Sequence, residues 1–369
     1  MKKLGFGLMR LPLTRPEDQR SVDQGAVNSM TAAFLDRGFT YFDTAYAYHG
    51  GVSEGVFKKA VMERYGREAF TIADKMPMWL IKETADYQRI FDEQTARTGA
   101  ACFDYYLLHA LDAGSYAKAL ETGGFEFVQR LKAEGKIRRA GFSFHDKAPV
   151  LDQILTQHPE MEFVQLQINY IDWEDENVQS RACYETARKH GKPVIVMEPV
   201  KGGCLASPPA EAEQLLRAQA PAASAASWAI RFAASLDGVL VVLSGMSTMD
   251  QLEDNMAILE DPAPLTPEEG EVIRRAAGII GGQIAVPCTG CGYCVEGCPQ
   301  RIPIPRYFTF FNDQKRYGLL PSILGSYSLA SKGAGKASGC VSCGQCEAHC
   351  PQHIPIPGEL RKVAAVFES

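Results

Sequence analysis

The amino-acid sequence predicts an α/β protein, a (β/α)8 TIM barrel followed by a small cysteine-rich domain. Three observations predict this class. Eight strand-like apolar runs alternate with amphipathic stretches up to about residue 260. The composition then becomes rich in Cys, Pro and Gly, and one cysteine motif occurs twice near the C-terminus. A chain of 369 residues is long enough for one large domain and one small one.

The strand-like runs are short and rich in β-branched or aromatic residues. They lie at 4–9, 40–45, 70–75, 105–110, 138–144, 163–169, 193–199 and 239–245. Helices are expected at amphipathic stretches such as 27–38, 87–98, 125–136, 178–191 and 249–259. Gly38, Gly135 and Gly191 end three of them, as glycines commonly do. This alternation predicts a parallel sheet with right-handed crossovers.

Eight such units in about 250 residues match a closed barrel. The alternative is an open, doubly wound sheet. It is disfavoured because no Gly-x-Gly-x-x-Gly follows the first strand.

Charge and hydropathy exclude several classes of function. The formal net charge is −6 and there is no basic run, which argues against a nucleic-acid partner. No run approaches the roughly 18 consecutive apolar residues of a membrane span. The N-terminal MKKLGFGLMRLP lacks the apolar core and cleavage site of a signal peptide. The sequence therefore predicts a cytoplasmic protein that binds neither nucleic acid nor membrane.

The segment 261–287 joins the two predicted domains, 1–265 and 266–369. It contains Pro, Gly and one short helical stretch. Between the two cysteine motifs, residues 302–339 predict a helix followed by a flexible tail.

The repeated phrase is Cys-x2-Cys-x2-Cys-x3-Cys-Pro, and each cysteine of the second copy follows its counterpart by 52 residues. The first copy is Cys288, Cys291, Cys294 and Cys298, and the second is Cys340, Cys343, Cys346 and Cys350. Nothing directs the chain to an oxidising compartment, so metal ligation explains them better than disulfides. The other three cysteines, Cys102, Cys183 and Cys204, are expected to be inert.

The spacing is that of bacterial ferredoxins. Three thiolates on a tight loop reach three corners of an iron–sulfur cube, and the fourth, before Pro, faces the other cluster. Two [4Fe–4S] clusters with crossed ligation are therefore predicted. One is held by Cys288, Cys291, Cys294 and Cys350, and the other by Cys340, Cys343, Cys346 and Cys298. Zinc is the competing metal, but zinc ribbons are spaced differently. The clusters are also expected to hold this small ferredoxin-like domain together.

Polar residues stand at the ends of the predicted strands. They are Asp43, Lys75, His109, Ser143, Gln167, Asn169 and Glu198. In a (β/α)8 barrel the reactive groups lie at the C-terminal ends of the strands. Because several polar residues would converge on one rim, the sequence predicts an active site there.

The phrases FDTAYAYHGGVSEGVFKKAV (42–61), ADK (73–75) and YYLLHA (105–110) resemble the aldo-keto reductase family. The resemblance runs from about Leu4 to Leu259. With the two cysteine motifs, the chain is similar to bacterial aldo-keto reductases that carry a C-terminal ferredoxin-like domain. The resemblance implies a small carbonyl or alcohol substrate and four catalytic residues, which are Asp43, Tyr48, Lys75 and His109.

The chemistry accounts for these four residue types. Reduction of a carbonyl by hydride needs a proton donor on the oxygen. A phenol, with a pKa of about 10, is a poor acid unless a nearby ammonium favours its anion. Tyr48 is therefore expected to be the general acid, or the base in reverse. Lys75 would lower the pKa of Tyr48, Asp43 would orient Lys75, and His109 would polarise the carbonyl.

The resemblance also implies a nicotinamide cofactor across the same rim. Ser143 and Gln167 would hold its carboxamide, and Asn255 its adenine. The turns 198–203 and 244–247 would hold its phosphates, which brings in Pro199, Val200, Gly202, Ser244 and Gly245. Backbone amides at a helix start suit phosphate.

The chain departs from the family pattern at four positions. Phe144 replaces the usual Asn after the serine, and Met197 replaces an aromatic residue. Gly245 and Gln251 replace the basic pair that grips the 2′-phosphate of NADPH, which removes ionic contacts. NADH, NADPH and another hydride source all remain open as cofactors.

A hydride carries two electrons, whereas a [4Fe–4S] cluster passes one. The role of the clusters beside a hydride-transfer site is therefore open to three interpretations. In one interpretation the clusters relay electrons between the barrel and a redox protein partner. In a second they are structural or redox-sensing. In a third, the chain is a non-catalytic or differently catalytic electron-transfer module whose barrel does not use NAD(P)H. The intact set of four residues argues against the third.

Overall fold

The computed structural model describes residues 2–16 and 18–368. Contacts divide the chain into two compact units. The first comprises residues 1–199 and 227–265, and the second comprises residues 200–226 and 266–369. The second unit thus takes in a segment, 200–226, that the sequence division at residue 265 assigns to the barrel. None of the described helices is long and apolar enough to cross a membrane.

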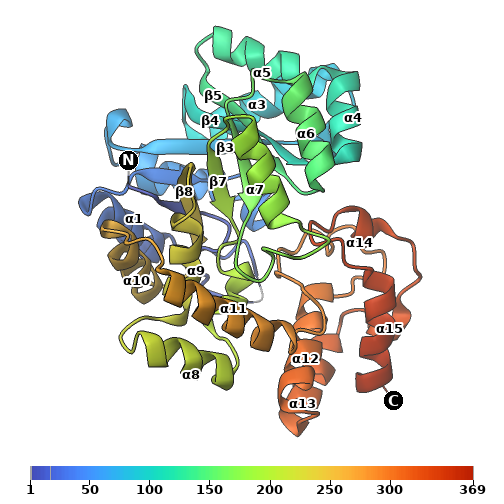
Figure 1. Cartoon of the computed structure of the whole chain (residues 1–369). Helices are drawn as coiled ribbons and strands as arrows, with labels where there is room; N and C mark the ends of the chain where they lie inside the picture. The colour runs from blue at the N-terminus through green and yellow to red at the C-terminus, as the bar shows by residue number, and fades with distance from the viewer. Residues whose placement is uncertain (1, 17, 369) are drawn as a thin grey trace. The chain divides into compact units, whose positions relative to one another are not determined.

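Eight parallel strands close the first unit into a barrel, as predicted (Figure 1). They are β1 (Leu4–Gly7), β2 (Tyr41–Asp43), β3 (Thr71–Pro77), β4 (Phe103–Leu111), β5 (Ile137–Phe144), β6 (Phe163–Gln167), β7 (Val194–Met197) and β8 (Val239–Gly245). Each strand pairs with the next, and β1 pairs with β8. Asp43 lies opposite Ala73, so the shortest strand, β2, ends two residues before Lys75 on β3.

The barrel interior is filled by side chains that point inward from the strands. They are Tyr41, Ala73, Tyr105, Leu107, Phe163, Ile195, Val241 and Leu243. Gly141 makes room for one of these rings, because a Cβ there would lie 2.6 Å from Phe163. The barrel is therefore a packed core, and only its rim is open to chemistry.

Helices surround the barrel strands. They are α1 (Gln24–Asp36), α2 (Ser53–Phe57), α3 (Thr84–Thr98), α4 (Ala113–Thr122), α5 (Gly124–Ala133), α6 (Ala148–Gln157), α7 (Ser180–Lys189), α9 (Ala225–Ala234) and α10 (Met249–Glu260). Local sequence sets several of their ends. Asp23 caps α1 and Asp112 caps α4 through side-chain acceptance of backbone N–H groups. Gly99 ends α3 in the left-handed conformation, at φ 72°.

The second unit is helical. It contains α8 (Ala210–Gln219), α11 (Pro267–Gly281), α12 (Ile304–Tyr317), α13 (Pro321–Ser331), α14 (Gln345–Ala348) and α15 (Ile356–Phe367). The helix α8 packs on α11, which begins with a capping box between Thr266 and Glu269. Gly202 lies against the backbone of Thr289, where a Cβ would be 2.3 Å from the Thr289 carbonyl oxygen.

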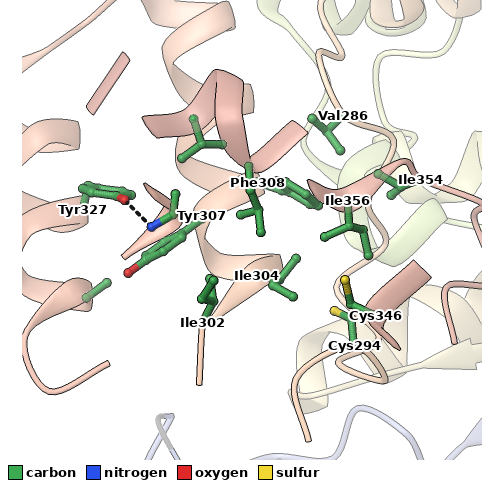
Figure 2. Packing of buried hydrophobic residues seen from close by; sticks show 14 residues of the cluster. Val286, Cys294, Ile302, Ile304, Tyr307, Phe308, Tyr327, Cys346, Ile354 and Ile356 are labelled. Carbon is green, nitrogen blue, oxygen red and sulfur yellow. Dashed lines mark hydrogen bonds between the residues drawn. The ribbon is translucent and has the colours of Figure 1, made fainter. Parts of the chain in front are cut away.

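The cysteine repeat of the sequence is also a repeat of structure. Gly292 and Gly344 take φ angles of 84° and 76°, and Arg301 and His353 take 52° and 51°. After each Ile-Pro step a helix begins, α12 at Ile304 and α15 at Ile356. Both copies share one core, with Cys294 and Cys346 at its edge (Figure 2).

The flexible tail expected before the second motif is largely ordered. The helix α13 runs to Ser331, and Ile323, Tyr327 and Ala330 on it are buried. The hydroxyl of Tyr307 then donates to the Gly335 carbonyl at 2.8 Å, and the Tyr327 oxygen accepts from Ala337 N–H at 3.2 Å. The expectation failed because the small residues of SLASKGAGKASG gave no sign of the aromatic pair that fixes them.

Candidate functional site

Lys75 is the centre of the polar group at the barrel rim. Its side chain is fully buried, and its Nζ donates to Asp43 Oδ1 at 2.5 Å, to the Thr44 carbonyl at 2.8 Å and to Tyr48 Oη at 3.1 Å. Adjacent strands β2 and β3 bring Asp43 and Lys75 together, and the 3-10 turn η1 (Tyr48–Gly51) presents Tyr48. The structure therefore brings three of the four predicted catalytic residues into direct contact.

His109, the fourth, lies near the end of β4 and is buried. Its ring centroid is 6.1 Å from that of Tyr48 and 5.0 Å from that of Trp79. Burial lowers the pKa of His109 well below its ordinary value, and the charges of Lys75 and His145 lower it further. His109 is therefore a neutral imidazole near pH 7.

Two opposing effects act on the pKa of the Asp43 carboxyl. Burial raises its pKa, whereas the charge of Lys75 and the hydrogen bond from Lys75 lower it. Burying two opposite charges is favourable only when they are well paired. The pair here has three hydrogen bonds from one ammonium, which is the full donor capacity of a lysine.

Ser143 and Gln167 lie at the ends of β5 and β6, and both are buried. Ser143 Oγ accepts from the Ala110 N–H at 2.7 Å. Gln167 Nε2 and Asn169 Nδ2 both donate to Asp172 Oδ2, at 2.7 and 2.6 Å. The sequence analysis missed Asp172, which orients both amides from the loop after β6. The acidic run IDWEDEN gave no sign of which carboxyl turns inward.

At the end of β8, Ser244 Oγ accepts from Asn255 Nδ2 at 2.9 Å. Gln251 Oε1 accepts from the Ser247 N–H at 2.8 Å. The stem of Arg10 fills the space beside Gly245, where a Cβ would lie 2.9 Å from Arg10 Cβ.

The guanidinium of Arg10 pairs with Glu198 at 3.7 Å. Arg10 follows β1 and was not predicted, because no strand-end pattern pointed to it. Pro199 ends the first segment of the barrel unit, whereas Val200 and Gly202 belong to the second unit.

Two cavities in the second unit are each lined by four cysteines. The first is lined by Cys288, Cys291, Cys294 and Cys350, together with Ile304, Phe308 and Ile356 among others. The second is lined by Cys298, Cys340, Cys343 and Cys346, with Ile302 and Leu360. Each cavity thus takes three cysteines from one motif and the last cysteine of the other.

The chemistry of these cysteines fits a cluster better than a single ion. Over residues 2–16 and 18–368, no group of three His, Cys, Asp or Glu side chains is placed to hold one metal ion. A [4Fe–4S] cluster instead takes each thiolate on a separate iron, so its ligands line a wider space. Burial raises the pKa of the Cys346 thiol to about 11, so binding a metal would have to displace a proton from Cys346.

Cys102, Cys183 and Cys204 are not among the residues that line the two cavities. Cys183 is buried, its Sγ donates to the Asp146 carbonyl, and burial raises its pKa to about 12. A thiol with so high a pKa is unreactive near pH 7.

Comparison with known proteins agrees with this arrangement. Residues 3–277 match the model of the aldo/keto reductase family, and residues 287–354 match the model of a 4Fe-4S dicluster domain. A search of curated proteins found no match.

Solved structures show the likeness of fold. An aldo-keto reductase of Bacillus halodurans, in its holo form, is 23% identical with a TM-score of 0.60, and covers 74% of this chain and 91% of its own. An aldo-keto reductase of Klebsiella pneumoniae in complex with NADPH is 23% identical with a TM-score of 0.59, and covers 74% and 90%. Because the family model matches most of the chain, the protein belongs to the aldo/keto reductase family and carries a 4Fe-4S dicluster domain after its barrel.

Proposed function

We propose that the protein reduces a small carbonyl compound, or oxidises the corresponding alcohol, with a nicotinamide cofactor and with Tyr48 as the general acid or base. One observation carries the proposal. The buried Lys75 ammonium contacts both Asp43 Oδ1 and Tyr48 Oη. No structural need of the fold requires three ionisable side chains to meet in this way, and such clusters are typical of catalytic sites.

The roles of Lys75 and Asp43 follow from this geometry. The ammonium at 3.1 Å from Tyr48 Oη stabilises the phenolate that remains after the proton leaves. Asp43, whose Oδ1 accepts from the ammonium at 2.5 Å, directs the lysine toward the phenol. Tyr48 can then give its proton to a carbonyl oxygen at neutral pH, as a general acid does.

His109 acts beside Tyr48 as a neutral donor. Since its imidazole is uncharged near pH 7, it can donate one N–H to the carbonyl oxygen without competing with Tyr48 as an acid. Trp79, whose ring lies 5.0 Å from that of His109, supplies an apolar wall on the same side. A substrate with an apolar group beside its carbonyl would fit these contacts.

The cofactor would be held by the polar groups at the barrel rim. The similar Klebsiella pneumoniae enzyme was solved with NADPH, and a bound nicotinamide nucleotide supplies the hydride. Ser143 and Gln167 are buried at the ends of their strands and are already oriented by Ala110 and Asp172, which suits a carboxamide.

The remaining predicted nucleotide contacts lie in the turn after β7, in β8 and in α10. The predicted contacts at Pro199, Ser244, Gly245, Gln251 and Asn255 lie on the barrel unit. Val200 and Gly202, which the resemblance also implies, belong to the second unit and are not part of the site proposed here. No basic side chain stands at 245 or 251, so we propose that NADH and NADPH are both accepted.

The C-terminal domain, residues 266–369, would hold two [4Fe–4S] clusters. The two cavities support crossed ligation, because each is lined by the four cysteines that the repeat predicts for one cluster. A bound cluster supplies one electron at a time. We propose that the clusters either exchange electrons with a protein partner or hold the domain together.

The function is tested with protein purified without oxygen and assayed on simple aldehydes and ketones with NADPH and with NADH. Tyr48→Phe should lower kcat by about 10²-fold or more. Tyr184→Phe makes the same chemical change where the hydroxyl donates to the Asp237 carbonyl on the surface, and should leave kcat unchanged. Undiminished turnover by Tyr48→Phe would rule out the assignment.

The same preparation distinguishes the two roles of the clusters. Bleaching of the visible absorption by a nicotinamide nucleotide would indicate an electron relay. Unchanged absorption during carbonyl reduction would indicate a structural role. Nucleotide-independent electron transfer without carbonyl reduction would favour a non-catalytic electron carrier.

A further inference from the structure

Behind Lys75, on the outer side of β3, lies a buried group of polar side chains that the proposed reaction does not use. Successive residues of a strand point to opposite faces. Lys75 points into the rim, and Asp74 therefore points outward, toward α2 and α3. Asp74, Glu54 and Gln94 are all fully buried there.

The main chain of Lys75 lacks part of its sheet ladder. The strand β2 ends at Asp43, opposite Ala73, and the last bond on that side runs from the Thr44 N–H to the Ala73 carbonyl at 3.0 Å. Lys75, two residues further along, directs its N–H and C=O to the same side. No strand is there to receive them, and buried backbone groups need partners.

Side chains take the place of the missing strand. Asp74 Oδ1 accepts from the Lys75 N–H at 2.8 Å, and Gln94 Nε2 donates to the Lys75 carbonyl at 3.0 Å. Gln94 is itself fixed, since its Oε1 accepts from the Tyr106 hydroxyl at 2.5 Å. The position of the Lys75 backbone at the rim therefore depends on two side chains from the opposite face.

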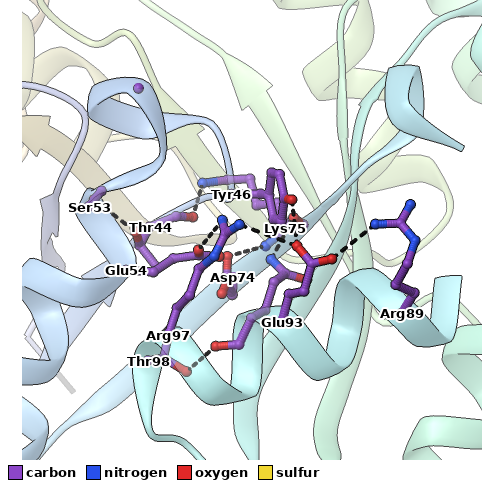
Figure 3. Close-up of polar contacts among 12 residues, drawn as sticks. Thr44, Tyr46, Ser53, Glu54, Asp74, Lys75, Arg89, Glu93, Arg97 and Thr98 are labelled. Carbon is purple, nitrogen blue, oxygen red and sulfur yellow. Dashed lines mark hydrogen bonds and ion pairs between the residues drawn. The ribbon is translucent and has the colours of Figure 1, made fainter. Parts of the chain in front are cut away.

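Asp74 in turn faces Glu54 of α2 (Figure 3). Asp74 Oδ2 and Glu54 Oε1 are buried, and neither receives a hydrogen bond from an amide, hydroxyl or ammonium of the described residues. The carboxyls of Asp74 and Glu54 are hydrogen-bond partners of each other, and Glu54 also has side-chain hydrogen bonds with Arg97 and Gln94. Two carboxyls can form a hydrogen bond only when one of them carries a proton.

The surroundings decide which carboxyl is protonated. Burial and the charge of Glu54 raise the pKa of Asp74 well above its usual value, although Lys75 opposes this. Burial also raises the pKa of Glu54, but Arg97 and the hydrogen bonds from Gln94 and Asp74 lower it. Arg97 Nη1 lies 3.2 Å from Glu54 Oε2. Tyr106, which also faces this pair, stays neutral because burial and both carboxyls raise its pKa.

We propose that Asp74 is a positioning residue which, protonated and hydrogen-bonded to Glu54, fixes the backbone of Lys75 so that its ammonium reaches Tyr48. The inference rests on the proposed role of Lys75. It adds a requirement that the four residues at the rim do not contain, a neutral acid on the far side of the strand.

Matched substitutions at position 74 test this. Asp74→Asn keeps a neutral group whose oxygen accepts from Lys75 and whose amide donates to Glu54, so kcat should stay within about twofold of wild type. Asp74→Ala leaves the Lys75 N–H without its acceptor. Its kcat should fall about tenfold with little change in KM. The alkaline limb of its kcat–pH profile should move to higher pH, because the ammonium is less firmly held beside the phenol.

Asp104 provides the control for a purely structural role. It is a buried acid that accepts from a β3 backbone N–H, that of Ile72, at 2.9 Å, but two arginines pair with it. Asp104→Asn should lower the melting temperature without moving the pH profile. Wild-type kcat and profile in Asp74→Ala, or equal losses in Asp74→Asn and Asp74→Ala, would overturn the proposal.

Infrared spectroscopy tests the proton directly and needs no turnover. Wild-type protein at neutral pH should show the C=O stretching band of a protonated carboxyl, which shifts in D2O. Asp74→Asn should lose the band and Asp104→Asn should keep it. A band that persists in Asp74→Asn contradicts the proposal even if Asp74→Ala does not fold. Full turnover by Tyr48→Phe would instead defeat the proposed function and leave this result standing.

Discussion

His109 is the residue at the rim whose charge state matters most, because a charged imidazole would compete with Tyr48 as the proton donor. It is neutral in the folded protein because burial and the charge of Lys75 lower its pKa. His49 is in a similar state. Its Nε2 accepts from the Leu11 N–H and its Nδ1 donates to the Gln19 carbonyl, and burial lowers its pKa. When the protein unfolds in acid, both histidines therefore bind a proton.

This gives a pH dependence of stability with a definite sign. Below the ordinary histidine pKa of 6.5, the unfolded chain binds a proton at position 109 that the folded chain excludes. The free energy of unfolding should therefore fall as the pH is lowered from 7 to 5, and the contribution of His109 should approach about 1.4 kcal/mol per pH unit below pH 6.5. Urea unfolding of wild type and His109→Gln across this range measures the contribution of His109. The free energy of unfolding should depend less steeply on pH in His109→Gln. Equal slopes would mean that His109 is protonated in the folded state.

At the scale of elements, the sequence predicts what is locally periodic. All eight strands were predictable because each is a short apolar run bounded by turn residues. Asp43, Tyr48, Lys75 and His109 could be proposed because they stand at or near strand ends, in known motifs. Asp74 could not, since its role follows from β2 being only three residues long. Asp172 and Arg10 depend likewise on how loops turn, which periodicity does not determine.

Close packing between neighbouring strands makes a second prediction at this scale. Gly141 of β5 lies opposite Phe163 of β6, and a Cβ would come within 2.6 Å of its ring. Gly141→Ala should lower the free energy of unfolding by about 1–3 kcal/mol through overpacking. In the exposed first turn of α4, Gly114→Ala meets only Asp112 Oδ1 at 3.5 Å, and should raise it by about 0.5–1 kcal/mol. Denaturant melts of both variants give the comparison, and a neutral Gly141→Ala would contradict the packing described.

At the scale of the whole molecule, a barrel of the aldo/keto reductase family is joined in one chain to a 4Fe-4S dicluster domain. The two cysteine motifs are not two separate sites. In each cavity the fourth lining cysteine comes from the other motif. The motifs are therefore expected to fold together around both clusters. If the proposed clusters are bound, the stability of this domain should depend on iron, because its apolar core is small.

Crossed ligation predicts which cysteine variants behave alike. The wild-type chain should contain about eight irons, four in each cluster. Cys350→Ser and Cys288→Ser, though in different motifs, should lose the same cluster and give the same electron paramagnetic resonance spectrum after reduction. Cys298→Ser and Cys340→Ser should share the other spectrum. Iron analysis and spectra of the four variants test this, and pairing by motif instead of by cavity would show that the ligation is not crossed.

The segment 200–226 has a consequence for how the molecule can be divided. It leaves the barrel after β7, places Gly202 against Thr289 and α8 against α11, and returns before β8. In a nascent chain, Ala212 and Leu216 of α8 therefore lack the α11 surface until residues beyond 265 leave the ribosome. For the same reason no single protease cut yields a clean barrel, and swapping the C-terminal domain between relatives would have to move both stretches of chain together.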